Sequence, residues 1–129
     1  MSFDNYHKEP GRIYMIKNYL GLTEKKVQVW EFSPYQMGEK ANQVIPEVQQ
    51  VTRIRPITHN APYVNIKGEF IKEEACAYVD SNWFRVFHYD FVRGSEMAFN
   101  SSPFSLLLTE SKAKKYFGDQ NPVGRTLRL

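Results

Sequence analysis

Proline and glycine recur along the chain at intervals that leave room only for short helices and strands. The 129 residues include 7 prolines and 7 glycines, and several of these end patterned segments: Pro10-Gly11, Pro34, Pro46, Gly118, Pro122 and Gly124. Proline cannot continue a helix or donate to a sheet ladder, and glycine favours turns. The sequence therefore predicts many short elements separated by turns.

Segments in which apolar and polar residues alternate are predicted as β-strands. They cover residues 12–20, 27–32, 48–57, 63–68 and 70–80, the last as one long strand or a strand pair. The apolar stretch at residues 104–109 predicts a buried strand, and residues 125–129 predict a closing strand.

Three further segments carry helix signals. Residues 3–9 suit a short helix that ends at Pro10-Gly11. Ser33 as N-cap and Pro34 begin a second helix, which ends before Pro46. Its predicted apolar face consists of Met37, Ala41, Val44 and Ile45. We expect Ser81 to cap a third helix, which is anchored through Trp83, Phe84 and Phe87.

Residues 111–117 predict a last helix, capped by Thr109 or Ser111 and ended by Gly118 with positive φ. We expect one face to be buried and the lysines to be exposed; the residues of that face are Ala113, Tyr116 and Phe117. With the strands above, this predicts an α+β fold in which a mixed sheet is combined with short helices.

The loop from Gly118 to Gly124 resembles a phosphate-binding loop only in part. Such loops have the spacing G-x-x-x-x-G-K-[ST] and precede a helix whose N-terminus faces the anion. Here the glycines are one residue too far apart, Arg125 replaces the lysine, and the predicted helix comes first. We interpret the loop as a structural connector between helix and strand.

Composition predicts a single domain over residues 1–129. Hydrophobic residues make up 42% of the chain, enough for a core without cross-links. The net charge of +3 comes from 17 basic and 14 acidic residues spread along the chain, which does not favour a nucleic-acid partner. No apolar run approaches the roughly 20 residues that span a bilayer.

No catalytic, cofactor-binding or metal-binding pattern is recognisable in the sequence. The histidines at positions 7, 59 and 88 are scattered, and Cys76 is interpreted as a small buried hydrophobe. We interpret Glu73 and Glu74 as exposed charges. Four aromatic residues near basic ones are assigned to core packing rather than to a nucleic-acid platform: Tyr14, Tyr19, Trp30 and Tyr35.

Three stretches together resemble one family. "FDNYHKEPGRIYMI" is similar to an entry motif Y-D-x-F/Y-H-x-x-x-x-R-I-Y-R-V, and "IPEVQQVTRIRP" to a P-E-V-x-x-V-x-R pattern. Residues 78–129 resemble a run that ends in V-V-L-T-E-S-x-A-x-K-Y-F-G-D-x-x-P-V/I-G-K-T-L, with Arg125 where lysine is commoner. These motifs are similar to those of the extracytoplasmic core domain of MacB/FtsX-like ABC transporter permeases, in the form typical of Bacteroidetes.

The resemblance implies a periplasmic Porter/Sabre-like domain that is truncated at its C-terminal side and performs no catalysis. It implies a permease of the inner membrane that works as a dimer with a cytoplasmic ATP-binding subunit and exports or extracts peptides, lipoproteins or drugs, or signals in the periplasm. A periplasmic partner protein is also expected. We expect the docking residues to be Trp83, Arg125 and Arg128. The alternative functions are a soluble binding module or an enzyme with an unrecognised site.

Overall fold

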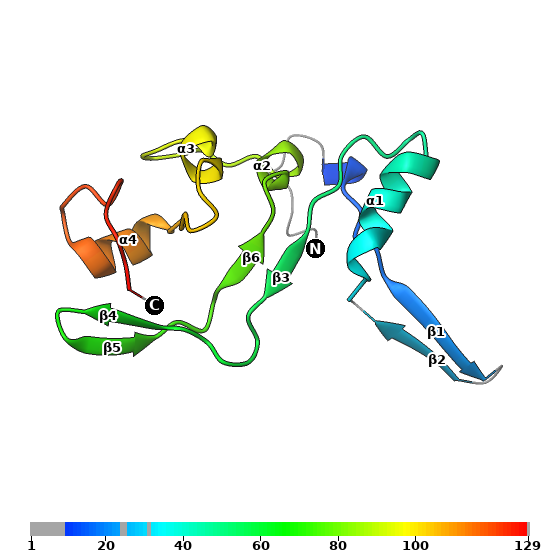
Figure 1. The fold of residues 1–129 in the computed structure, drawn as a ribbon, viewed down its shortest axis with the longest axis horizontal. Helices are drawn as coiled ribbons and strands as arrows, with labels where there is room; N and C mark the ends of the chain where they lie inside the picture. Colours follow the sequence, from blue (N-terminus) through cyan, green and yellow to red (C-terminus); the bar gives the residue numbers. More distant parts are fainter. Residues whose placement is uncertain (1–9, 24–25, 31, 129) are drawn as a thin grey trace. The chain divides into compact units, whose positions relative to one another are not determined.

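The computed structural model describes residues 10–23, 26–30 and 32–128 (Figure 1). In chain order the elements are η1 (Pro10–Arg12), β1 (Asn18–Thr23), β2 (Lys26–Trp30), α1 (Tyr35–Val44), β3 (Ile54–Pro56), β4 (Tyr63–Ile66), β5 (Glu69–Lys72), β6 (Ala77–Val79), α2 (Trp83–Val86), α3 (Glu96–Asn100) and α4 (Glu110–Phe117). The predicted α+β class with short helices is confirmed. The helix predicted at residues 3–9, and His7 within it, lie outside the described residues.

The strands of the described residues pair as three separate two-stranded antiparallel sheets. β1 pairs with β2, β3 with β6, and β4 with β5, so the strands predicted for one mixed sheet are distributed over three ladders. The segment predicted as one strand or a strand pair at residues 70–80 is a pair, but β5 and β6 belong to different sheets.

The chain forms two compact units. Unit 1 consists of Met1–Arg53 and Asn82–His88, and unit 2 of Ile54–Ser81 and Tyr89–Leu129. Each unit is described separately below.

Unit 1 contains the β1–β2 hairpin, which begins later than predicted and places Tyr19 opposite Val29. A two-stranded sheet alone cannot bury its faces, because burial requires a second layer. The assignment of four aromatic side chains to core packing was accordingly wrong. All four are exposed, from 49% for Trp30 to 84% for Tyr14, with Tyr19 and Tyr35 between them.

Helix α1 begins one residue later than predicted, with Pro34 at the N-cap position. The Ser33 hydroxyl makes no cap, since Ser33 lies one residue before the N-cap position, and it donates to the carbonyl of Ile16 at 3.3 Å. The helix ends before Pro46, as predicted. Its buried position is Gly38, whereas Val44 is 71% exposed, so the predicted apolar face is correct only in its first turns.

Helix α2 is a single turn that is held by packing. Its N-cap is Asn82 rather than the predicted Ser81. The side chain of Asn82 makes no capping hydrogen bond, and its Nδ2 donates to the Val51 carbonyl at 3.2 Å. Phe84 is buried, which agrees with the predicted anchoring role. The Trp83 and Phe87 rings pack at 4.3 Å between centroids.

Unit 2 contains the β4–β5 hairpin, whose two faces differ in burial. Val64 lies opposite Ile71 and is almost completely buried, while Tyr63 and Phe70 are exposed. This alternation is the period of two that a strand with one covered face requires.

Two strands predicted in unit 2 are absent, and one helix was missed. Residues 104–109 form no strand, and Phe104 is 94% exposed, because within the described residues this stretch has no ladder partner. Residues 125–128 also form no strand; the amide of Asn65 in β4 donates to the Arg128 carbonyl at 3.2 Å, but one backbone bond does not make a ladder. The missed helix is α3, which is too short to show periodicity and is capped by the Ser95 hydroxyl.

Helix α4 begins one residue earlier than predicted and ends where predicted, but of the face predicted to be buried only Tyr116 is buried, while Ala113 and Phe117 are half-buried. The Thr109 hydroxyl accepts a hydrogen bond from the Lys112 amide at 3.3 Å, so Thr109 is the N-cap. Gly118 ends the helix with φ of 61°, and Gly124 has φ of 79°, a region that glycine enters without steric cost. The loop between them connects α4 to the segment that reaches β4.

Candidate functional site

Among the described residues of unit 2, Glu73 is a charged residue whose side chain is buried. This residue follows β5, and its amide donates to the Pro62 carbonyl at 2.9 Å, which extends the β4–β5 pairing by one step. Because side chains alternate along a strand, Glu73 lies on the same face as Ile71, the covered face of the hairpin. The residue is only 4% exposed, so its interpretation as an exposed charge was wrong.

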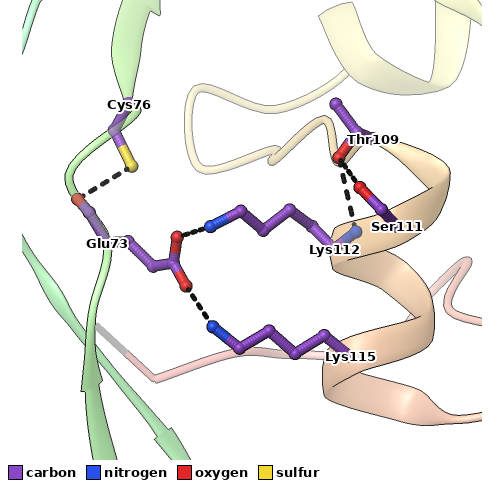
Figure 2. Close-up of polar contacts among 6 residues, drawn as sticks. All are labelled: Glu73, Cys76, Thr109, Ser111, Lys112 and Lys115. Atoms are coloured by element: carbon purple, nitrogen blue, oxygen red, sulfur yellow. Dashed lines mark hydrogen bonds and ion pairs between the residues drawn. The ribbon is translucent and has the colours of Figure 1, made fainter.

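Three side chains of α4 meet this buried carboxylate, and Figure 2 shows two of them, Lys112 and Lys115. The ammonium of Lys112 pairs with one carboxylate oxygen, and that of Lys115 lies 3.3 Å from the other. The Tyr116 hydroxyl also hydrogen-bonds to the carboxylate. Residues spaced i, i+3 and i+4 lie on one face of a helix, so α4 presents all three to Glu73 together.

We call these four residues the Glu73 cluster: Glu73, Lys112, Lys115 and Tyr116. Their surroundings determine which of them are charged. Hydrogen bonds from Lys112 and Tyr116 lower the pKa of Glu73 to about 2, against the opposing effect of burial. Burial and the neighbouring carboxylate raise the pKa of the Tyr116 hydroxyl, which therefore stays protonated and remains a donor. The cluster holds one anion and two cations.

The α4 lysines were predicted to be exposed, which holds for Lys114 and Lys115 but not for the half-buried Lys112. The sequence carried one usable signal for the cluster. Alternation from the apolar Ile71 places Glu73, rather than Glu74, on the covered face, and an acidic residue there requires a cationic partner. Nothing in the sequence indicated that α4 would supply that partner.

The three expected docking residues have different surroundings. Trp83 belongs to unit 1, where it is half-buried against Phe87. Arg125 and Arg128 belong to unit 2 and are exposed. Arg125 donates through Nε to the Asn121 carbonyl at 3.0 Å, and its guanidinium carbon lies 5.9 Å from the centre of the Phe117 ring.

The remaining candidate chemistry is dispersed. His59 and His88 are exposed, and Cys76 is half-buried with its thiol directed at the Glu73 carbonyl at 3.5 Å. Across residues 10–23, 26–30 and 32–128, no group of three potential metal ligands comes together. Over the same residues, none of the helices has the length and apolar character needed to cross a membrane.

Comparison with known proteins gives one family. The chain matches the family described as "MacB-like periplasmic core domain" over residues 2–129. Neither the comparison with curated proteins nor that with solved structures gives a match.

Proposed function

The chain belongs to the family of MacB-like periplasmic core domains, and from this membership we infer its place in a transporter. The family is a periplasmic, non-catalytic part of ABC transporter permeases. We propose that this member couples ATP hydrolysis in the cytoplasm to export or extraction of a peptide, lipoprotein or drug, or to periplasmic signalling. We further propose that it is a single domain of the Bacteroidetes type.

The observation that carries this proposal is the family match over residues 2–129. Exposed apolar side chains in both units, such as Trp30 and Phe104, are compatible with protein contacts.

We propose that the working assembly is a permease dimer in the inner membrane, with this domain in the periplasm. Its other proposed partners are a cytoplasmic ATP-binding subunit, reached through the membrane helices of the permease, and a periplasmic protein.

Trp83, Arg125 and Arg128 are proposed as docking residues. A photoreactive residue at Arg125 of the full-length permease should cross-link to one of these proteins, and the same residue at the exposed Lys40 should not.

The coupling role is tested by replacing residues 1–129 with a glycine–serine linker in the full-length permease. The variant is reconstituted with its ATP-binding subunit in proteoliposomes, and movement of a labelled peptide, a lipoprotein and a cationic dye is measured. We expect basal ATP hydrolysis to continue and ATP-dependent movement of the accepted probe to be lost.

The matched control is the intact permease with Glu74→Gln, which changes one exposed charge in the same domain. It should retain both activities. Probe movement by the linker variant at the rate of the intact permease would show that this domain is not needed for coupling.

A further inference from the structure

Helix α4 is held to the rest of unit 2 by the ion pairs of the Glu73 cluster and by burial of Tyr116. Among its eight residues only Tyr116 is buried, while Phe117 and Ala113 are half-buried. A helix of this length is not stable in water by itself, so it depends on what holds it against the rest of unit 2. Lys112 and Lys115 tie the helix to the rest of unit 2 through their ion pairs with Glu73.

The two sides of the cluster differ in how they are held and in solvent access. Glu73 is held by its backbone bond to Pro62 and lies on the covered face of the β4–β5 hairpin. Lys112 and Lys115 reach it through long side chains that are 34% and 46% exposed. The carboxylate is therefore a fixed anchor, and the lysines are the movable partners.

This asymmetry determines what it costs to separate the pair. The lysine ammoniums can return to water at small cost, because they are already partly hydrated. A carboxylate that stays buried without its cations is costly, and the cost is relieved when the helix leaves and water reaches the site. Loss of the lysines should therefore favour an opened arrangement more strongly than loss of the carboxylate charge.

We propose that the Glu73 cluster is a releasable latch. While the lysines pair with Glu73, α4 stays docked beside the β4–β5 hairpin; when the pairing is broken, α4 separates from the hairpin and loses its helical protection while the hairpin stays folded. This inference concerns unit 2 alone and holds whether or not the proposed transport function is correct.

Amide hydrogen exchange of the 129-residue chain at neutral pH tests the latch. The reporters in α4 are the amides of Ala113 and Gly118, which donate to Thr109 and Lys114. The reporters in the hairpin are the β4–β5 ladder amides and that of Glu73. In Glu73→Gln we expect the α4 amides to exchange about tenfold faster or more, because charge-assisted hydrogen bonds are lost. The hairpin ladder should stay within about twofold of its rate in the unmodified chain.

A double variant, Lys112→Met with Lys115→Met, should speed exchange in α4 more than Glu73→Gln does, because it leaves the carboxylate buried without cations. The control is Glu74→Gln, which removes a neighbouring charge that pairs with Lys72 outside the cluster. It should leave α4 unchanged.

Two results would overturn the latch. One is equal acceleration in α4 and in the hairpin, which would mean that the cluster only contributes to global stability. The other is unchanged α4 exchange in both the glutamine and the double methionine variants. If the methionine variant does not fold, the glutamine variant decides alone, since it is close to the original side chain in shape.

Discussion

At the residue scale, the structure differs most from the sequence analysis where the environment of a side chain depends on a distant element. Glu73 and Glu74 are adjacent and chemically identical, yet one is buried under α4 and the other is exposed beside Lys72. Strand alternation distinguishes them once the hairpin face is known. The partner of Glu73 lies 39 positions away in the chain, and no local pattern encodes that contact.

The low pKa of Glu73 predicts a specific acid sensitivity. Its carboxyl pKa falls from an ordinary 4.5 to about 2 in the folded chain, so the folded state binds this proton less readily than the unfolded state does. The stabilisation is therefore complete above about pH 4.5 and is lost as the pH falls through about 2. Chemical denaturation between pH 7 and pH 2.5 should show a free energy of unfolding that falls more steeply in the unmodified chain than in Glu73→Gln.

The control for this measurement is Glu74→Gln, which should follow the unmodified chain. Parallel pH profiles for the unmodified chain and Glu73→Gln would mean that the carboxylate is not stabilised by the cluster in solution.

At the element scale, elements with strong local signals were predicted well. Helix α4 has a threonine cap, an apolar face and a terminal glycine, and its predicted bounds are within one residue of the observed ones. Residues 104–109 had only apolar character, which does not distinguish a strand from an unpaired segment. Strands are completed by partners, and within the described residues this stretch has none.

The packing of α1 gives a prediction at the same scale. A β-carbon at Gly38 would lie 2.6 Å from Cγ1 of Val51, which is too close for an unstrained contact. Gly38→Ala should therefore lower the free energy of unfolding by about 1–3 kcal/mol, in spite of the higher helix propensity of alanine. Urea denaturation measures the change. Adding Val51→Ala removes the obstructing methyl groups and should recover part of the loss.

Gly21→Ala is the matched control, because a β-carbon there meets nothing within 4 Å. Its effect should remain within about 0.5 kcal/mol. Equal losses at Gly38 and Gly21 would contradict the close approach of α1 to residue 51.

At the scale of the whole molecule, the α+β class followed from the sequence because it depends on the kinds of element present. The pairing of strands did not follow, since β3 pairs with β6 across two intervening strands and no turn connects them directly. The exposed aromatics have the same origin. Tyr19 and Trp30 each stand in an alternating stretch, but alternation indicates only that a face is suited to burial, and among the described residues no layer buries either side chain.

The last prediction concerns nucleotide binding by the whole chain. In the proposed transporter ATP binds a separate subunit, so this chain should bind neither ATP nor inorganic phosphate saturably. The loop at residues 118–124 is the segment most similar to a phosphate site. It follows α4, however, and the amide of Gly118 is already used by the Lys114 carbonyl at 2.8 Å. The carbonyl end of a helix repels anions, and the net charge of +3 gives only weak, salt-sensitive attraction.

Titration with ATP at 150 mM salt, followed by amide chemical shifts, should give small linear changes. Saturable shifts confined to residues 118–126 at micromolar ATP would show that the loop is a phosphate site after all.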